Sequence, residues 1–223
     1  MAVVIDVLRA TTTALAALEA GIPSVRAVPD LDAALALRKA GMLVAGEREG
    51  LRVEGFDYGN SPIEIAAAGT AGKPLALCST NGSRALLAPD AEVIFAGCIR
   101  NAGATAAAVL EMAHDGGVVL LQGSGQDGAP TAEDAIAAGA VIEALSASGA
   151  SLDLDGEAER ARRAWSRVAA APADGLLCTP HGQYLASLGF EEDVRYAAIL
   201  DASPHAVCVR EGVLTLVPRR VPD

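Results

Sequence analysis

The chain has 223 residues, of which 52% are hydrophobic and only 3% are aromatic, and its formal net charge is −11. This composition excludes a disordered chain and predicts a core of alanine, valine, leucine and isoleucine. The acidic excess argues against nucleic acid and against an anionic membrane surface, because both are bound through basic patches. A small anionic ligand is compatible with this charge if local arginines and a divalent cation receive it.

Strand and helix patterns alternate along the chain. The sequence predicts strands at 3–5, 24–28, 42–45, 74–78, 92–96 and 118–121, the last expected to be buried on both faces. Between and after them it predicts helices at 12–20, 31–39, 63–68, 83–87, 102–114, 131–146 and 157–170. An irregular stretch at 51–62 and a final strand or hairpin at 207–217 complete the chain.

This alternation predicts an α/β fold, a layered α/β/α arrangement with a mainly parallel sheet. We expect residues 1–150 to form the main subdomain, which carries most of the site motifs. Residues 151–223 are expected to form a C-terminal α/β portion packed closely on it. In such sheets ligands bind beyond the carboxyl ends of the strands.

The cysteines and the N-terminus indicate the compartment. No pair of cysteines has CxxC spacing, and Cys78, Cys98 and Cys208 fall in apolar runs, which predicts buried free thiols. A reducing, cytoplasmic location fits this pattern. Charged residues close to the N-terminus argue against a signal peptide, and no uncharged run is long enough to span a bilayer. Since a strand is predicted from residue 3, we expect the natural chain to begin earlier.

Three apolar strands each run into a polar loop that opens into a helix, at 6–13, 79–84 and 123–134. Each loop places hydroxyls, glycines, an arginine or a carboxylate at a helix N-terminus, where free N–H groups and the helix dipole favour anions. If the strands are parallel, all three loops lie along one edge of one sheet. A phosphate and its metal ion would fit there.

Asp6 ends the first strand and is a candidate ligand for Mg²⁺, which prefers oxygen donors. The alternative is a solvated charge or a helix cap. Arg9 together with Thr11 and Thr12 suits a phosphate or sulfonate, although one threonine there is expected to cap the helix.

Two further segments offer similar chemistry. Glu47 is a candidate second metal ligand and Arg48 a candidate anion clamp, with a surface ion pair as the alternative. The turn-rich stretch that follows carries Asp57, Asn60 and Ser61, which are donors and acceptors of the kind that site loops use. An ordinary turn before the next helix is the alternative for this stretch.

The two remaining loops also have structural alternatives. The segment from Thr80 through Asn81 and Gly82 to Arg84 can form a nest of N–H groups for an anion, or a hairpin turn, which the helical pattern after it disfavours. Glu133 and Asp134 are candidate metal ligands, but a helix-capping box explains them equally well. None of the three histidines has metal-ligand spacing, and the absence of a Gly-x-Ser-x-Gly motif argues against a serine hydrolase.

Read in order, these segments resemble the motifs of the 2-phosphosulfolactate phosphatase family, which is named for a step in coenzyme M biosynthesis. The matching stretches are 4–13, 45–48, 55–62 and 80–85, with Asn101-Ala102, Glu133-Asp134 and Ala138-Gly139. Each stretch alone is weak, whereas the ordered set is specific. The resemblance implies two closely joined subdomains and a Mg²⁺-dependent hydrolase acting on a small phosphorylated sulfonate.

The sequence therefore predicts a cytoplasmic phosphatase that uses Mg²⁺ to convert 2-phosphosulfolactate to sulfolactate and phosphate. The catalytic candidates are Asp6, Arg9, Glu47 and Asp57, and the metal candidates are Asp6, Glu47, Glu133 and Asp134. The substrate-binding candidates are Thr11, Thr12, Arg48, Asn60, Ser61, Thr80, Asn81, Gly82, Arg84 and Asn101. We expect no nucleic-acid or membrane partner, and the sequence leaves a homo-oligomer open.

Other readings stay open at this point. A phosphoryl-aspartate route through Asp6 is a mechanistic alternative, although Leu8 stands where haloacid-dehalogenase phosphatases carry a second aspartate. A non-catalytic binding protein for a small anionic metabolite is an alternative from another class. A lyase or mutase acting on a phosphorylated acid is the third.

Overall fold

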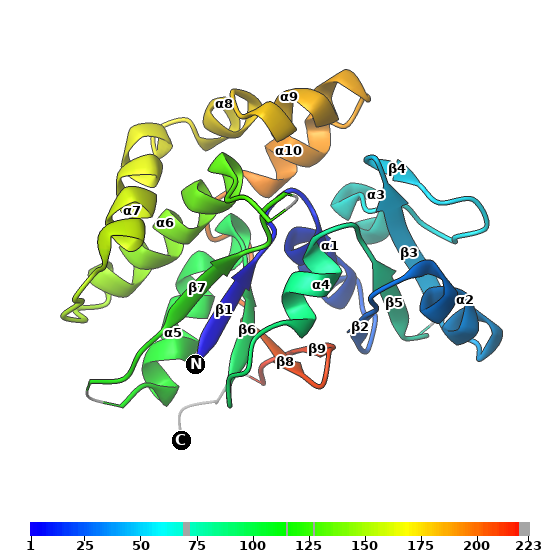
Figure 1. Cartoon of the computed structure of the whole chain (residues 1–223), viewed down its shortest axis with the longest axis horizontal. Coiled ribbons are helices and arrows are strands. Elements are labelled where there is room, and N and C mark those ends of the chain that lie inside the picture. Colours follow the sequence, from blue (N-terminus) through cyan, green and yellow to red (C-terminus); the bar gives the residue numbers. More distant parts are fainter. Residues whose placement is uncertain (69–71, 115, 127, 219–223) are drawn as a thin grey trace.

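One nine-stranded sheet organises the chain, in the order β4-β3-β5-β2-β9-β8-β6-β1-β7 (Figure 1). The computed structural model describes residues 1–68, 72–114, 116–126 and 128–218. The strands are β1 (Ala2–Ile5), β2 (Val25–Ala27), β3 (Leu43–Arg48), β4 (Leu51–Arg52), β5 (Leu75–Cys78), β6 (Ile94–Gly97), β7 (Leu120–Gly123), β8 (Val207–Arg210) and β9 (Val213–Leu216). The helices are α1 (Ala10–Glu19), α2 (Leu31–Lys39), α3 (Pro62–Ala66), α4 (Gly82–Leu87), η1 (Ile99–Asn101, a 3₁₀ turn), α5 (Ala102–Met112), α6 (Ala132–Ala147), α7 (Gly156–Val168), α8 (Pro172–Leu177), α9 (Pro180–Ser187) and α10 (Glu191–Ala197).

The α/β class is confirmed, but the sheet is mixed and not mainly parallel. β1 pairs in parallel with β6 and β7, and β5 pairs in parallel with β2 and β3. The predicted C-terminal hairpin, β8 and β9, enters the middle of the sheet and pairs antiparallel with β6 and β2. A strand pattern indicates that a segment joins a sheet but not which strands become its neighbours, so the sequence does not reveal this insertion.

The parallel register aligns the strand ends that carry the polar loops. Ile5 at the end of β1 lies beside Gly97 of β6 and Gly123 of β7. Asp6 and Ser124, the next residues along their strands, therefore leave the sheet at the same edge. In Figure 1 the helices α8, α9 and α10 lie over this edge.

The prediction that the strand at 118–121 is buried on both faces is wrong. β7 begins at Leu120 and is the edge strand of the sheet, where β1 is its one neighbour among the described strands. Leu120 is 52% exposed and Val118 is 81% exposed, so this segment is not buried on both faces. Four apolar residues in a row do not distinguish a central strand from an edge strand.

The helices α8, α9 and α10 escape the sequence patterns because each is too short to show a helical period. Their starts are marked by other signals: Pro172 and Pro180 occupy the first turns of α8 and α9, and Thr179 caps α9 by accepting the Gly182 N–H. The described residues after 150 build no sheet of their own. α7 packs along α6, and β8 and β9 complete the common sheet. The proposed division at residue 150 stays a prediction.

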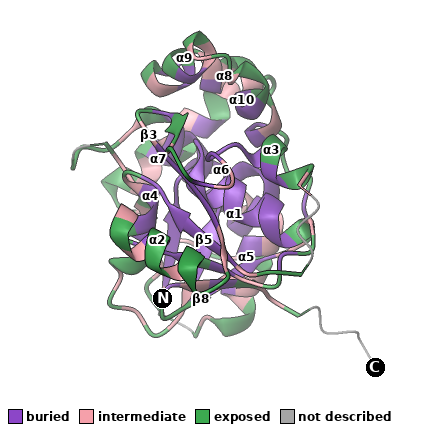
Figure 2. Ribbon diagram, turned by 90° about the vertical axis from the view of Figure 1, so that its right-hand side faces the viewer, coloured by how far each residue is buried: buried purple, intermediate pink, exposed green. Residues whose placement is uncertain are grey.

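The burial of the helices differs in a way that matters for the site. Figure 2 shows α1 buried among the other elements and α2 with an exposed outer face. All of α1 from Ala10 to Leu18 is buried, so its threonine hydroxyls need partners inside the protein. Cys78 and Cys98 are buried free thiols as predicted, whereas Cys208 is only partly buried. No helix in the described ranges has the length and apolarity that a bilayer crossing requires.

Candidate active site

A cavity of about 550 Å³ lies beyond the carboxyl ends of β1, β3, β5 and β7. The three strand-to-helix loops meet at this cavity, and α9 contributes a further wall through His181 and Tyr184. Of the residues predicted for the site, the structure brings to the cavity Asp6, Arg9, Glu47, Asn60, Thr80, Asn81, Glu133 and Asp134. Asp127, in the loop before α6, lies outside the described residues.

Four buried carboxylates, those of Asp6, Glu47, Glu133 and Asp134, line the cavity. Burial raises the pKa of Asp6 to about 6, and the charges of Glu47 and Glu133 act in the same direction. Burial, reinforced by the charge of Asp6, raises the pKa of Asp134 to about 7. No ion pair is recorded for any of the four within the described part of the chain.

The carboxylates differ in how the backbone holds them. Asp6 Oδ1 accepts the Ala10 N–H at the start of α1, at 3.0 Å. Asp134 accepts the Val7 N–H at 3.1 Å and the Ser124 hydroxyl at 3.1 Å. These bonds fix the strand ends to the helix starts, so the carboxylates are held in defined places.

Glu47 and Glu133 are the other two buried carboxylates that line the cavity. Glu47 accepts the Thr80 N–H at 2.8 Å and the Gly50 N–H at 3.0 Å, which joins the ends of β3 and β5. Glu133 makes no hydrogen bond within the described residues, although it is only 4% exposed. A buried carboxylate without a partner is unfavourable unless a cation or a donor from a ligand reaches it.

The donor set fits a hard divalent cation such as Mg²⁺, because every candidate ligand is a carboxylate oxygen. Among the described residues, no three acidic, histidine or cysteine side chains stand close enough to share one ion. In proteins, Mg²⁺ is usually held by one or two carboxylates together with water and substrate phosphate. Asp6 and Glu133 are the best candidates, since Glu47 is already bonded by backbone N–H groups through both of its oxygens.

The raised pKa values predict an unusual pH dependence of stability in the absence of divalent cations. The folded protein holds protons on Asp6 and Asp134 more tightly than the unfolded chain, so its free energy of unfolding falls between about pH 4 and pH 7. The shift of Asp6 alone corresponds to on the order of 3 kcal/mol. Urea unfolding in EDTA at pH 5 and pH 7.5 measures this loss, and added Mg²⁺ is expected to reverse it. A free energy of unfolding that rises over this range without metal contradicts the prediction.

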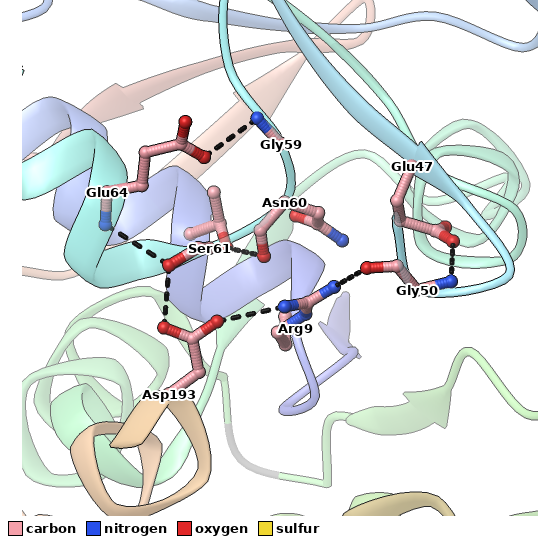
Figure 3. A network of polar contacts seen from close by, with 9 residues as sticks. Arg9, Glu47, Gly50, Gly59, Asn60, Ser61, Glu64 and Asp193 are labelled. Carbon is pink, nitrogen blue, oxygen red and sulfur yellow. Dashed lines mark hydrogen bonds and ion pairs between the residues drawn. The ribbon is translucent and has the colours of Figure 1, made fainter. Parts of the chain in front are cut away.

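Arg9 lines the cavity, but its guanidinium is bonded to other residues of the protein and not to the cavity (Figure 3). Its Nη1 donates to Asp193 Oδ2 at 2.9 Å, and its Nη2 donates to the Gly50 carbonyl at 2.6 Å. The guanidinium also lies over the Phe190 ring, 4.3 Å from its centre. Asp193 in turn accepts the Ser61 hydroxyl at 2.6 Å. Arg9 therefore joins the loop after β1 to α10 and to the turn after β3.

Asp57 does not line the cavity, and its catalytic role stays a prediction. Its carboxylate pairs with Arg38 of α2 at 2.8 Å and accepts the Val44 N–H at 2.9 Å. Arg48 also lies outside the cavity, where its Nη1 donates to the Glu47 carbonyl and its Nη2 lies 3.5 Å from Cys78 Sγ. Both side chains therefore bind backbone or side-chain groups of the protein outside the cavity.

Several predicted substrate-binding residues prove to be bonded within the protein. The Thr11 hydroxyl donates to the Asp6 carbonyl at 2.8 Å, and the Thr12 hydroxyl donates to the Val7 carbonyl at 2.9 Å. Asn101 accepts the Cys98 N–H at 2.9 Å and fixes the end of β6. With Ser61 bonded to Asp193, none of these four side chains lines the cavity.

Gly82 supports the site without lining it. A Cβ at this position would collide with Asp6 Oδ2, so only glycine lets the Asp6 carboxylate lie where it does. We expect Gly82→Ala to displace that carboxylate and to lower kcat/KM about 10- to 100-fold, because misplacement by about 1 Å has effects of this size. Steady-state phosphate release measures the change. Gly156→Ala in α7 is a matched control, since its Cβ meets only the end of Arg160 at 3.6 Å. Unchanged kcat/KM in Gly82→Ala contradicts the argument.

Several residues of this region were not among the predicted site residues. Ser124, Thr131, His181 and Tyr184 line the cavity, and Asp193 holds Arg9. The Gly-Ser-Gly loop at 123–125 was a usable signal for Ser124. For Asp193 no local signal exists, because its partner Arg9 is 184 residues away in the chain.

An α/β sheet with a carboxylate-lined cavity at its strand ends has the layout of enzymes that bind an anion together with a metal ion. The model of the 2-phosphosulpholactate phosphatase family matches residues 1–212. A protein of Carboxydothermus hydrogenoformans named "Probable 2-phosphosulfolactate phosphatase" is 38% identical over 98% of this chain and 91% of its own length. Proteins of the same name from Deinococcus radiodurans and Thermotoga maritima are 38% and 34% identical, over 91% and 96% of this chain and 85% and 91% of their own lengths. The chain belongs to the 2-phosphosulfolactate phosphatase family.

Proposed function

We propose that this protein is a Mg²⁺-dependent phosphatase that hydrolyses 2-phosphosulfolactate to sulfolactate and inorganic phosphate. The names of the relatives support the substrate. The observation that carries the proposal is that four buried carboxylates line one cavity, at the edge of the sheet where α/β enzymes bind ligands. A protein that only binds an anion gains nothing from acidic walls, whereas one that binds an anion with Mg²⁺ requires them.

In this proposal Asp6 and Glu133 hold the metal ion, and Glu47 and Asp134 flank it. When bound, Mg²⁺ offsets part of the phosphate charge as the ester bond breaks. Asp6 and Glu133 are held in position by the end of β1 and the start of α6, which carry them. The chain's own residues therefore fix where the phosphorus atom is presented.

Two amide side chains complete the arrangement. The Asn81 side chain lines the cavity without a hydrogen bond among the described residues, so its N–H groups are available to a phosphate oxygen. Asn60 Oδ1 is buried in the cavity wall and has no partner among the described residues. A buried acceptor without a partner is unfavourable, so we expect a donor of the ligand or of its water to satisfy it when the cavity is occupied.

Phosphate release from 2-phosphosulfolactate and from other small phosphorylated acids, measured with Mg²⁺ and in EDTA, tests the proposal. We expect release of phosphate from 2-phosphosulfolactate with Mg²⁺ and almost none in EDTA. A binding protein would retain the ester without turnover, and a mutase would move the phosphoryl group without releasing phosphate. A lyase would leave a double bond in its product, so sulfolactate must appear together with the phosphate. If the protein hydrolyses no phosphate monoester with any divalent cation, the proposal is wrong.

A further inference from the structure

A second cavity, of about 380 Å³, lies beside the candidate active site. The two cavities meet at Asn81 and Ser124, which line both of them. Arg84 of α4 and Gln122 of β7 form the polar walls of the second cavity. The two cavities differ in charge, because the described walls of the second hold one arginine and no carboxylate.

Arg84 is available to a ligand in a way that Arg9 is not. Arg84 makes no hydrogen bond, ion pair or ring contact within the described residues, whereas both terminal nitrogens of Arg9 are bonded to Asp193 and Gly50. A guanidinium offers five N–H donors in a planar fork that matches the oxygens of an oxyanion.

The backbone beneath Arg84 is fixed, although its side chain is exposed. α4 packs against α1, β1 and β2, and its Ala85 and Leu86 side chains are buried. The Ser83 hydroxyl donates to the Leu77 carbonyl at 2.9 Å and accepts the Ser79 N–H at 2.8 Å. The Arg84 guanidinium therefore projects from a fixed stretch of backbone next to the proposed phosphate site.

We propose that the second cavity binds the sulfonate of the substrate, with Arg84 and Gln122 as its ligands. This inference rests on the proposed function, in which the first cavity takes the phosphate. The substrate carries a sulfonate and a carboxylate besides its phosphate, so it needs a binding place beyond the phosphate site, and the acidic first cavity accepts an anion only together with a cation. Asn81 and Ser124 then lie between the phosphate and the sulfonate, and Arg84 determines specificity for a sulfonated ester.

The test compares two substrates that differ only in the sulfonate, 2-phosphosulfolactate and 2-phospholactate. Arg84→Gln is expected to lower kcat/KM for 2-phosphosulfolactate about 10- to 100-fold, mainly through KM, since a charge-assisted hydrogen bond is lost. For 2-phospholactate we expect a change of less than about twofold. Arg84→Lys should recover part of the loss. Arg167→Gln on the exposed side of α7 removes the same charge away from both cavities and should change neither substrate.

Equal losses on both substrates overturn the inference, because Arg84 then serves the phosphate or the carboxylate that the two esters share. An unchanged Arg84→Gln variant overturns it as well. If the wild-type protein releases phosphate from neither ester, the proposed function fails, and calorimetry with sulfolactate and lactate then decides the inference separately. Tighter binding of sulfolactate that is lost in Arg84→Gln supports the subsite, and equal or absent binding of the two acids overturns it.

Discussion

Replacing Asp6 with asparagine is expected to lower kcat for phosphate release about 10³-fold or more, because several kcal/mol of metal-borne stabilisation of the transition state are lost. The same variant should unfold at a higher temperature than the wild type in EDTA at pH 7.5. At that pH the wild-type Asp6 is ionised although burial and two neighbouring carboxylates oppose its charge. An asparagine keeps an acceptor for the Ala10 N–H and removes that charge.

The Asp6→Asn experiment has two readouts, which separate the effect of the buried charge on stability from its effect on catalysis. Thermal unfolding in EDTA reports on the charge, and steady-state phosphate release with Mg²⁺ reports on the chemistry. Asp32→Asn on the exposed face of α2 removes the same charge outside the site and should alter neither quantity strongly. If Asp6→Asn keeps full Mg²⁺-dependent turnover, Asp6 is not a metal ligand and the proposed site must be redrawn around Glu133.

The gathering of the strand ends could be predicted from the sequence because it follows from local patterns and one rule about parallel strands. Asp6, Asn81 and Asp134 each follow or open a recognisable element, and parallel strands bring such ends to one edge. The insertion of β8 and β9 into the centre of the sheet could not be predicted in this way. It depends on pairing between segments far apart in the chain, which no local pattern records.

The predicted site residues that do not line the cavity have a common physical reason for lying elsewhere. Asp57 and Asn60 lie three residues apart in one irregular loop, yet only Asn60 lines the cavity, because Arg38 and the Val44 N–H hold the Asp57 carboxylate. The hydroxyls of Thr11 and Thr12 are bonded to carbonyls of the preceding loop because α1 is buried on all sides. Residue type predicted a chemical capacity, and the packing decided whether a ligand or the protein uses it.

Arg9 is the clearest case of a side chain suited to bind an anionic ligand that is instead bound by the protein itself. The side chains of Arg9 and Asp193 are only 2% and 3% exposed, so removing one partner leaves a buried charge without compensation. We expect Asp193→Ala to lower the free energy of unfolding by about 3 to 5 kcal/mol, measured by urea denaturation. The control is Glu192→Ala, which removes an exposed carboxylate from the same helix and should change stability by less than about 0.5 kcal/mol.

A double-variant cycle separates the ion pair from the other contacts of these residues. Asp193→Leu alone leaves the Arg9 charge buried, whereas Arg9→Met combined with Asp193→Leu removes both charges. We expect the double variant to be more stable than the sum of the single effects predicts, by about 1 to 3 kcal/mol. Strict additivity would mean that the two charges do not stabilise each other. A positive coupling would identify Asp193 as the residue through which α10 holds Arg9, and through Gly50 the Glu47 carboxylate, at the cavity.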